Sequence, residues 1–290
     1  MSRILVTGAS GFIGQHLVRR LQEAGREVHA AGSAAGDVVD ERTWFGYPKA
    51  DVVIHLAGKA FVPASWDQPA AFIRCNLMGT VGALDYCVRQ KARLVLVSSY
   101  LYGRPDSLPI PETAPLLANN PYALSKKLAE EACRFYANSL GAQITILRPF
   151  NVYGSGQSDA FLVPSIIRQV ATSDCVRVKD LEPKRDYVYV DDVVRAIISA
   201  ADRQGEFSVF NIGSGVSHSV DELVQIVQLV MGKALPVVSD VERRKDEVMD
   251  TVANIAQARM HLGWIPRWTL LEGVRQMVET ASVSVEPTSE

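Results

Sequence analysis

Short apolar runs alternate with longer amphipathic runs through the first two-thirds of the chain. The short runs are rich in Val, Ile and Leu and are bounded by Gly, Pro or polar residues, which is typical of buried strands. The longer runs have helical spacing of apolar residues. This order predicts an α/β fold, a parallel doubly wound sheet covered by helices on both faces. The expected strands are Arg3–Thr7, Glu27–Ala31, Asp51–Leu56, Leu94–Ser98 and Gln143–Leu147, and the expected helices are Ile13–Ala24, Ala70–Gln90 and Tyr122–Leu140.

The pattern loosens after Pro149, where helical periodicity continues without a clean alternation with strands. Ser219 and Glu222 have the spacing of a capping box and predict the start of a helix. Asp191 and Asp192 are interpreted as caps of another helix rather than as catalytic acids. The helices expected in this part are Phe161–Ala171, Asp192–Ala201 and the run from Ser219 through Met231.

These patterns predict two domains and a tail. Residues 1–150 should form the sheet domain, and residues 151–280 should form a smaller α/β lobe interleaved with the last strands of the sheet. Residues 281–290 are small, polar or acidic for the most part and are expected to fray as a flexible tail.

Composition narrows the classes of function. The net charge of −2 gives no strong field for nucleic acid or for an anionic membrane, so neither is expected as a partner. The four cysteines lie far apart and form no metal-ligand pair, so no metal site is expected. Widely spaced thiols suit a reducing compartment, and neither a signal peptide nor an apolar run of membrane-spanning length is visible. We therefore expect a cytoplasmic protein.

A glycine-rich turn follows the first expected strand and opens the first helix. It reads Thr-Gly-Ala-Ser-Gly-Phe-Ile-Gly, with glycines at Gly8, Gly11 and Gly14. Glycine is needed where the backbone turns tightly or approaches a phosphate closely, and the helix N-terminus then offers N–H groups to a pyrophosphate. Because the turn lies at a strand-to-helix junction, it predicts a Rossmann-type dinucleotide site.

The end of the second strand bears on which dinucleotide binds. A carboxylate there would hold the adenosine ribose of NAD, but the segment reads Ala-Ala-Gly-Ser and ends at Ser33. Nothing in it repels a 2′-phosphate, and Ser33 has a hydroxyl to donate. NADP is therefore favoured over NAD, although no arginine lies nearby to bind the phosphate. Asp37, beside Val38, is either a contact for the adenine amino group or an ordinary turn carboxylate.

The main chemical signal is Tyr122-Ala-Leu-Ser-Lys126. Residues four apart on a helix share a face, so the ammonium of Lys126 should lie near the phenol of Tyr122. Together with the positive nicotinamide ring of a bound cofactor, it should lower the pKa of Tyr122 and favour the phenolate. Such a pair is suited to donate or accept a proton at a carbinol or ketone oxygen. Ser98, at the end of the fourth strand, is predicted to hydrogen-bond the same oxygen. A lone tyrosine and lysine at this spacing are common, and it is their position after the glycine loop and the serine that makes the trio informative.

Taken in order, these motifs resemble the extended short-chain dehydrogenase/reductases that modify nucleotide sugars. The likeness runs from Arg3 to about Glu279. Besides the glycine loop and the trio, it includes His55-Leu-Ala-Gly, Asn76-Leu-Met-Gly-Thr, Arg148-Pro-Phe-Asn-Val-Tyr-Gly, Arg185-Asp-Tyr-Val-Tyr-Val-Asp-Asp, Asn211-Ile-Gly-Ser-Gly, Arg244-Lys-Asp-Glu-Val and Leu262-Gly-Trp. Two loops, residues 58–66 and 156–161, are most similar to those of GDP-4-keto-6-deoxy-mannose reductases.

The resemblance implies roles for individual residues. A nucleotide-diphosphate sugar would be held by Asn151, and its diphosphate by Arg185 and Arg244, whose forked guanidinium groups suit paired charge-assisted hydrogen bonds. Ser99 would also face the substrate. Tyr122 and Lys126 would contact the cofactor as well as act in catalysis. The remaining cofactor contacts would come from Gly8, Gly11, Phe12, Ile13, Gly14, Ser33, Asp37, Val38, Leu56, Ala57 and Pro149. The family often forms homodimers through the helices expected at Ala70–Gln90 and Tyr122–Leu140, so a homodimer is expected here.

One departure from the family narrows the reaction. The 4,6-dehydratases have an Asp-Glu pair directly after the catalytic serine or threonine, and this chain has Ser99 and Tyr100 there. Neither residue is a carboxylic acid, so dehydration is disfavoured. Three hypotheses remain: reduction of a 4-ketosugar, 4-epimerisation with tightly held NAD, and a non-catalytic dinucleotide sensor. The missing ribose carboxylate argues against the epimerase, and the intact trio argues against the sensor.

Replacing Gly32 with Asp should shift the cofactor preference from NADPH to NADH. The new carboxylate would repel the 2′-phosphate and offer an acceptor to the ribose. The ratio of kcat/KM for the two cofactors measures this shift. A wild-type protein that strongly prefers NADH would contradict the interpretation of the missing carboxylate.

Overall fold

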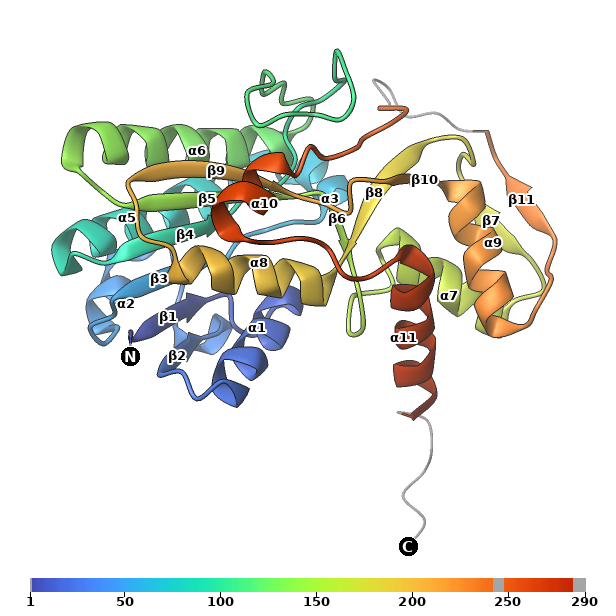
Figure 1. Cartoon of the computed structure of the whole chain (residues 1–290), viewed down its shortest axis with the longest axis horizontal. Coiled ribbons are helices and arrows are strands. Elements are labelled where there is room, and N and C mark those ends of the chain that lie inside the picture. The colour runs from blue at the N-terminus through green and yellow to red at the C-terminus, as the bar shows by residue number, and fades with distance from the viewer. Residues whose placement is uncertain (1, 242–247, 284–290) are drawn as a thin grey trace, which may run out of the picture.

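The computed structural model describes residues 2–241 and 248–283. Six parallel strands form the main sheet in the order β2-β1-β3-β4-β5-β9 (Figure 1). The fold class predicted from the hydrophobic pattern is therefore confirmed. The strands are β1 (Ile4–Thr7), β2 (Val28–Ala31), β3 (Val52–His55), β4 (Arg93–Val97), β5 (Ile144–Pro149) and β9 (Phe207–Ile212).

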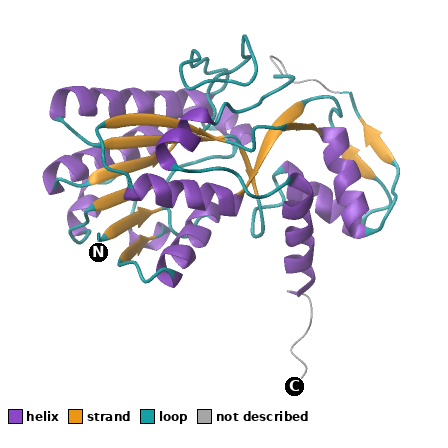
Figure 2. Cartoon of the chain, viewed as in Figure 1, coloured by secondary structure: helices purple, strands orange, loops and turns teal. Residues whose placement is uncertain are grey.

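Alternation along the strands divides the sheet's side chains between two cores. In β1, Ile4 and Val6 face one side and Leu5 faces the other, since successive side chains in a strand point to opposite faces. The first side is covered by α1 (Phe12–Glu23) and α8 (Val190–Asp202). The second is covered by α2 (Glu41–Gly46), α5 (Gly79–Gln90) and α6 (Pro121–Leu140). Figure 2 shows these helices flanking the strands on both sides.

The helix expected at Ala70–Gln90 is interrupted. The chain forms α3 (Val62–Asp67) and α4 (Pro69–Ile73), then one π-helical turn, η2 (Arg74–Met78), before α5 begins. The spacing of apolar residues does not predict a π-helical turn. Such a turn contains one more residue than an α-helical turn, and the helical pattern on each side of it stays largely intact. Such turns occur often at functional sites, and Asn76 lies in this one.

The C-terminal lobe packs beside the carboxyl ends of the strands (Figure 1). Its larger sheet has the order β10-β8-β6, and a second pairs β11 with β7. Sequence patterns missed these strands because most are only three residues long. The lobe's strands are β6 (Asn151–Tyr153), β7 (Val176–Val178), β8 (Lys184–Tyr189), β10 (Ser217–Ser219) and β11 (Val237–Ser239), and its helices are α7 (Leu162–Thr172), α9 (Val220–Met231) and α11 (Leu270–Val283). Helix α10 (Ala256–Leu262) returns to the main sheet and packs against β9 and α8.

Of the two helix starts predicted from capping residues, the structure confirms the start of α9 and corrects the start of α8. The capping box is confirmed, because Glu222 N–H donates to Ser219 Oγ at 3.0 Å and Ser219 N–H donates to Glu222 Oε2 at 2.7 Å. The interpretation of Asp191 and Asp192 as caps of α8 is wrong, since Tyr189 occupies the cap position. Asp192 is buried and accepts hydrogen bonds from the backbone N–H groups of residues 267 and 268, so it binds the chain ahead of α11 to α8.

The last helix extends into the segment that was predicted to be a flexible tail, residues 281–290. Helix α11 continues to Val283, three residues into the segment expected to fray. Residues 284–290 of the predicted tail lie outside the described residues.

Gly14→Ala should destabilise the protein. A Cβ at this position would lie 2.2 Å from the carbonyl oxygen of Gly8, so α1 would have to move away from β1. Overpacking of this kind costs about 1–3 kcal/mol of unfolding free energy. Chemical denaturation measures the loss. Gly46→Ala is the matched control because its Cβ would meet no atom within 4 Å, and equal stability of the two variants would contradict the close contact.

Candidate active site

The glycine loop lies at the carboxyl end of β1 and is packed too tightly for side chains. Gly8 has φ +72°, and a Cβ there would lie 2.6 Å from the backbone nitrogen of Ala57. Gly11 is the N-cap of α1 and supplies no capping side chain, so the first N–H groups of the helix point to the loop without a side-chain acceptor. A helix N-terminus of this kind binds anions, and Phe12, Ile13 and Gly14 form its first turn. These residues therefore fit the diphosphate of a dinucleotide.

The end of β2 lies directly beside this loop. The backbone N–H of Ser33 donates to Ser10 Oγ at 3.3 Å, and a Cβ at Gly32 would lie 3.1 Å from the same hydroxyl. Ser10 was not among the predicted cofactor residues, although it lies within the glycine-loop motif. Asp37 Oδ1 accepts from the N–H of Val39 at 3.0 Å, which is the turn-carboxylate role left open from the sequence.

The other predicted cofactor residues lie on neighbouring strand ends. Leu56 and Ala57 follow β3 and contact Gly8, and Pro149 is the last residue of β5. Val38 packs towards the N-terminus of α5, where a Cβ at Gly79 would lie 2.9 Å from it.

The three predicted catalytic residues come together at the end of β4. Asn120 caps α6 by accepting from the N–H of Ala123 at 2.8 Å, which places Tyr122 in the first turn of the helix. Lys126 is buried one turn later, and its Nζ donates to the carbonyl of Val97 at 3.0 Å. Ser98 follows Val97, and its buried Oγ has no hydrogen-bond partner among the described residues. An unpaired buried hydroxyl beside a tyrosine and a lysine is a group that a ligand oxygen would satisfy.

The expected lowering of the Tyr122 pKa by Lys126 does not occur in this structure. Burial raises the pKa of the Tyr122 phenol, and a hydrogen bond with the Ser99 side chain partly offsets this. The ammonium of Lys126 is directed at the Val97 carbonyl instead. Burial lowers the pKa of Lys126 to about 8, so the lysine itself is the group with a pKa nearest neutrality.

Asn76 connects the trio to the π-helical turn, a role that the sequence did not predict. Its amide donates to Ser125 Oγ at 2.8 Å and to the carbonyl of Lys59 at 3.0 Å, and its oxygen accepts from the Lys59 N–H at 2.8 Å. Ser125 Oγ in turn donates to the carbonyl of Tyr122 at 2.7 Å. The buried amide thereby holds residues 58–59 against the first turns of α6.

The predicted substrate residues lie on β6 and β8 of the lobe. Asn151 is paired in register with Tyr187, and its amide donates to the Asp186 carbonyl at 3.3 Å. Arg185 lies two residues before Tyr187, so their side chains leave β8 on the same face. The Arg185 guanidinium donates to the Val248 carbonyl at 2.6 Å. Arg244 lies outside the described residues, so its position relative to Arg185 stays a prediction.

Tyr187 is a site residue that sequence reasoning missed. Its buried hydroxyl has no hydrogen-bond partner among the described residues, and burial raises its pKa to about 12. The charge of Arg185 acts in the opposite direction, and Tyr100 lies close enough to interact electrostatically with both Tyr187 and Tyr122. The periodicity of the motif marked residue 187 as a strand position but gave no sign that its hydroxyl is unpaired.

A cavity of about 590 Å³ is lined by residues of α6, β9 and the segment 112–116 and by Arg148 of β5. None of its lining residues belongs to the predicted catalytic or cofactor set, so it is not the candidate active site. Within residues 2–241 and 248–283, no helix is long and apolar enough to cross a membrane.

A glycine loop at the end of β1, with a serine, a tyrosine and a lysine at the end of β4, defines a nicotinamide-dinucleotide enzyme of the short-chain dehydrogenase/reductase type. The chain belongs to the NAD dependent epimerase/dehydratase family, whose sequence pattern matches residues 4–213. The family predicted from the motifs is thereby confirmed, and with it an enzyme that depends on NAD or NADP.

Individual relatives fall into two groups. The chain is 31% identical to the GDP-6-deoxy-D-mannose reductase of Pseudomonas aeruginosa over 95% of this chain and 96% of the relative. It is 30% identical to a UDP-glucose 4-epimerase of Halalkalibacterium halodurans over 96% and 94%.

Two solved structures are similar to this chain over nearly its whole length. RMD from Pseudomonas aeruginosa complexed with NADPH has a TM-score of 0.91 at 29% identity, over 98% of this chain and 100% of that one. UDP-glucose 4-epimerase from Thermotoga maritima with UDP-glucose has a TM-score of 0.90 at 30% identity, with the same coverage.

His55, the last residue of β3, should make stability depend on pH. Burial holds its pKa at about 3, and its Nδ1 lies 2.7 Å from Thr7 Oγ1. The unfolded chain therefore binds one more proton below the usual histidine pKa of about 6.5, so this contribution is present above that pH and is lost as the pH falls towards 3. Between pH 7 and 5 the loss is about 2 kcal/mol.

Chemical denaturation at several pH values checks this dependence. His55→Gln should reduce the acid-side loss of unfolding free energy, whereas His29→Gln, at an exposed position on β2, should leave the pH dependence as in the wild type. An unchanged slope in His55→Gln would contradict a neutral, buried His55.

Proposed function

We propose that this enzyme reduces the C4 ketone of a nucleotide-diphosphate 4-keto-6-deoxyhexose, with NADPH as the preferred cofactor. One observation carries the proposal. An intact serine, tyrosine and lysine trio is combined with an adenosine end of the site where Ser33, after β2, lies beside Ser10 of the glycine loop and the segment after β2 has no carboxylate at positions 32 and 33. A reductase must exchange its cofactor at each turnover, and weak anchoring of the adenosine ribose suits that requirement.

The cofactor preference is supported at the adenosine end of the site. Ser10 and Ser33 lie side by side at the junction of the glycine loop and β2, and both hydroxyls are suited to donate to a 2′-phosphate. The similar structure of RMD from Pseudomonas aeruginosa is complexed with NADPH.

The substrate class is supported by the loops that resemble those of the reductases. Phe61 from the first loop and Phe161 from the second meet edge to face, with ring centroids 5.8 Å apart. The two loops, which are far apart in sequence, therefore lie together beside the trio. On the lobe, the Arg185 guanidinium donates to the Val248 carbonyl, and the role of Arg185 and Arg244 at a diphosphate is what the family resemblance implies.

Dehydration is disfavoured by what the two residues after Ser98 do. Ser99 hydrogen-bonds the Tyr122 phenol, and Tyr100 stacks on Phe150 with ring centroids 5.3 Å apart. Neither residue is an acid that could protonate a leaving hydroxyl group.

The proposed chemistry is a hydride transfer followed by protonation. The nicotinamide supplies the hydride when the reduced cofactor is bound. Tyr122 donates its phenolic proton to the oxygen that develops negative charge, and Ser98 Oγ donates a hydrogen bond to the same oxygen. Lys126 supplies a positive charge near Tyr122 and Ser98, and it orients the nicotinamide ribose of the cofactor. The proton that Tyr122 loses returns from solvent through neighbouring hydroxyls.

The alternative is a nucleotide-sugar 4-epimerase, favoured by the similarity to UDP-glucose 4-epimerases at 30% identity. It would use the same trio but would retain NAD and return the hydride to the substrate.

We also propose that the enzyme acts in the cytoplasm as a homodimer that pairs α5 and α6 with their symmetry mates. These helices expose large apolar side chains, which a partner would cover, at Val88, Leu124, Leu128, Phe135 and Leu140.

Stoichiometry separates the reductase from the epimerase. Purified protein should hold little cofactor and should oxidise one NADPH for each nucleotide 4-ketosugar reduced, as followed by cofactor absorbance and product analysis with GDP- and UDP-linked substrates. Protein that purifies with bound NAD and interconverts two nucleotide 4-hydroxysugars without added cofactor would establish the epimerase instead.

Tyr122→Phe should lower kcat by about 10²–10⁴-fold while the protein stays folded, because general acid catalysis contributes on this scale. Tyr136→Phe is the matched control. It lies on the same helix, and its hydroxyl bonds Asp85 on α5, away from the trio. Equal kcat values in the two variants would remove Tyr122 from the chemistry.

A further inference from the structure

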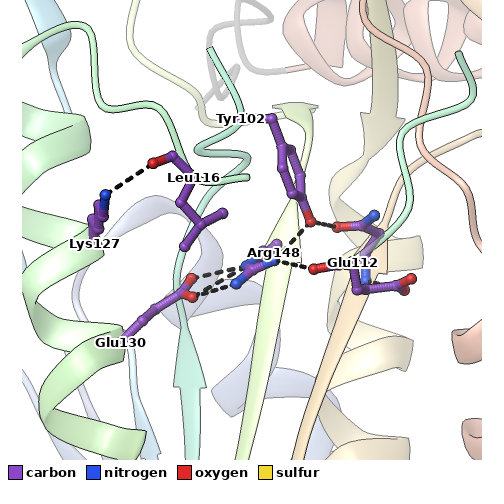
Figure 3. Close-up of polar contacts among 7 residues, drawn as sticks. Tyr102, Glu112, Leu116, Lys127, Glu130 and Arg148 are labelled. Atoms are coloured by element: carbon purple, nitrogen blue, oxygen red, sulfur yellow. Dashed lines mark hydrogen bonds and ion pairs between the residues drawn. The ribbon is translucent and has the colours of Figure 1, made fainter. Parts of the chain in front are cut away.

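A buried ion pair joins α6 to β5. The side chains of Arg148 and Glu130 are each 3% exposed. Arg148 Nη2 donates to Glu130 Oε2 at 2.6 Å, and Nε lies 3.1 and 3.2 Å from the two carboxylate oxygens. Figure 3 shows the guanidinium directed at the carboxylate across the gap between helix and strand.

The remaining donors of Arg148 extend the contact to two loops. Its Nη1 donates to the Tyr102 hydroxyl at 2.8 Å and to the Glu112 carbonyl at 3.0 Å (Figure 3). Tyr102 then donates to Asn211 Oδ1 on β9 at 2.6 Å. The network therefore links five segments around one buried cation, and the charge of Arg148 is paired with that of Glu130 within it.

Every segment that carries a member of the trio is tied to this network. Glu130 follows Lys126 by four residues on α6, so the two lie one helical turn apart on the same face. Tyr102 follows Ser98 by four residues in the chain that leaves β4, and Arg148 precedes Pro149 at the end of β5.

Lys126 is surrounded by few other charges. The ionisable groups that act on it are Cys75 of η2 and Glu130 and Cys133 of α6, and it acts in turn on His55 of β3. Burial raises the pKa of Cys133 well above its usual value and that of Cys75, and it lowers the pKa of His55 to about 3. All three are therefore uncharged near neutral pH, which leaves Glu130, whose carboxylate is paired with Arg148, as the carboxylate that acts electrostatically on this lysine.

We propose that Glu130 and Arg148 are positioning residues for the Tyr122 and Lys126 pair. Arg148 fixes the turn of α6 that carries Glu130 against β5 and the loop after Ser98, and the Glu130 carboxylate keeps Lys126 in its charged form. The inference rests on the catalytic role proposed for Tyr122 and Lys126. Neither Glu130 nor Arg148 takes part in the proposed chemistry. The proposal gives both residues a function in addition to stabilising the fold.

A purely structural role would have a different signature. Buried ion pairs commonly contribute little net stability, and replacement of both partners by apolar groups of similar size is often neutral. Loss of one partner is costly because it leaves a buried charge without compensation. The double variant Glu130→Gln with Arg148→Met therefore removes the negative charge near Lys126 without leaving Arg148 unpaired.

Four variants test the proposal: Glu130→Gln, the double variant, Glu130→Asp and Glu131→Gln. Glu130→Asp keeps the carboxylate. Glu131→Gln is the matched control, since it is the same substitution at the next residue, which is exposed. The readouts are the alkaline limb of the kcat pH profile and the titration of Lys126 itself, followed by NMR in protein with ¹³C-labelled lysine and assigned with Lys126→Met.

Loss of the carboxylate should move both the alkaline limb and the Lys126 titration to lower pH. The expected shift is roughly 0.5–1 pH unit in Glu130→Gln and in the double variant, because a nearby negative charge favours the ammonium form. Glu130→Asp should restore values close to the wild type, and Glu131→Gln should leave them unchanged.

The proposal is overturned if the double variant is folded and both titrations match those of the wild type, since the pair would then serve stability alone. The NMR titration needs no turnover. A shift of Lys126 in a protein that reduces none of the 4-ketosugars would thus uphold the coupling and refute only the proposed reaction.

Discussion

The close backbone contact at the amino end of the chain is the constraint on which the rest of the site depends. Gly8 turns with a positive φ, and its Cα lies against the backbone at Leu56 and Ala57, while Gly14 lies against the Gly8 carbonyl. These contacts bring β1, α1 and the end of β3 within a distance that no Cβ allows. The N-terminus of α1 is then held at the sheet's carboxyl edge, where the ends of β4 and β5 also lie. The serine, the tyrosine and the lysine are thus placed relative to a fixed anion site.

Much of this arrangement could be predicted from the sequence, because it is encoded locally. Four strands of the main sheet, β1, β3, β4 and β5, are nearly continuous apolar runs, which is the signature of strands buried on both faces. The glycine spacing and the Tyr122 and Lys126 pair are likewise short-range patterns. Each predicts a position at a strand end or on a helix face, and the parallel topology then brings those positions to one edge.

Other features could not be predicted because they depend on long-range contacts. β9 pairs with β5 across some sixty residues of chain, and its apolar pattern does not distinguish it from the short strands of the lobe. The π-helical turn at Asn76 depends on partners at Lys59 and Ser125 that are remote in sequence. Spacing along a helix also does not reveal that Lys126 donates to the Val97 carbonyl rather than towards the phenol of Tyr122, whose pKa is raised by burial.

The place of β9 at the edge of the main sheet has a consequence for how the protein can be divided. The chain leaves the sheet after β5, builds β6, α7, β7 and β8 of the lobe, and returns through α8 to complete the sheet before it enters the lobe again. The two units therefore share several covalent crossings instead of a single linker. A fragment that ends near residue 150 would lack both α8, which covers one face, and the strand that shields β5. Hinge motion about one flexible segment is also ruled out by this route. Any change in the angle between the sheet and the lobe must instead be shared by all of these crossings at once.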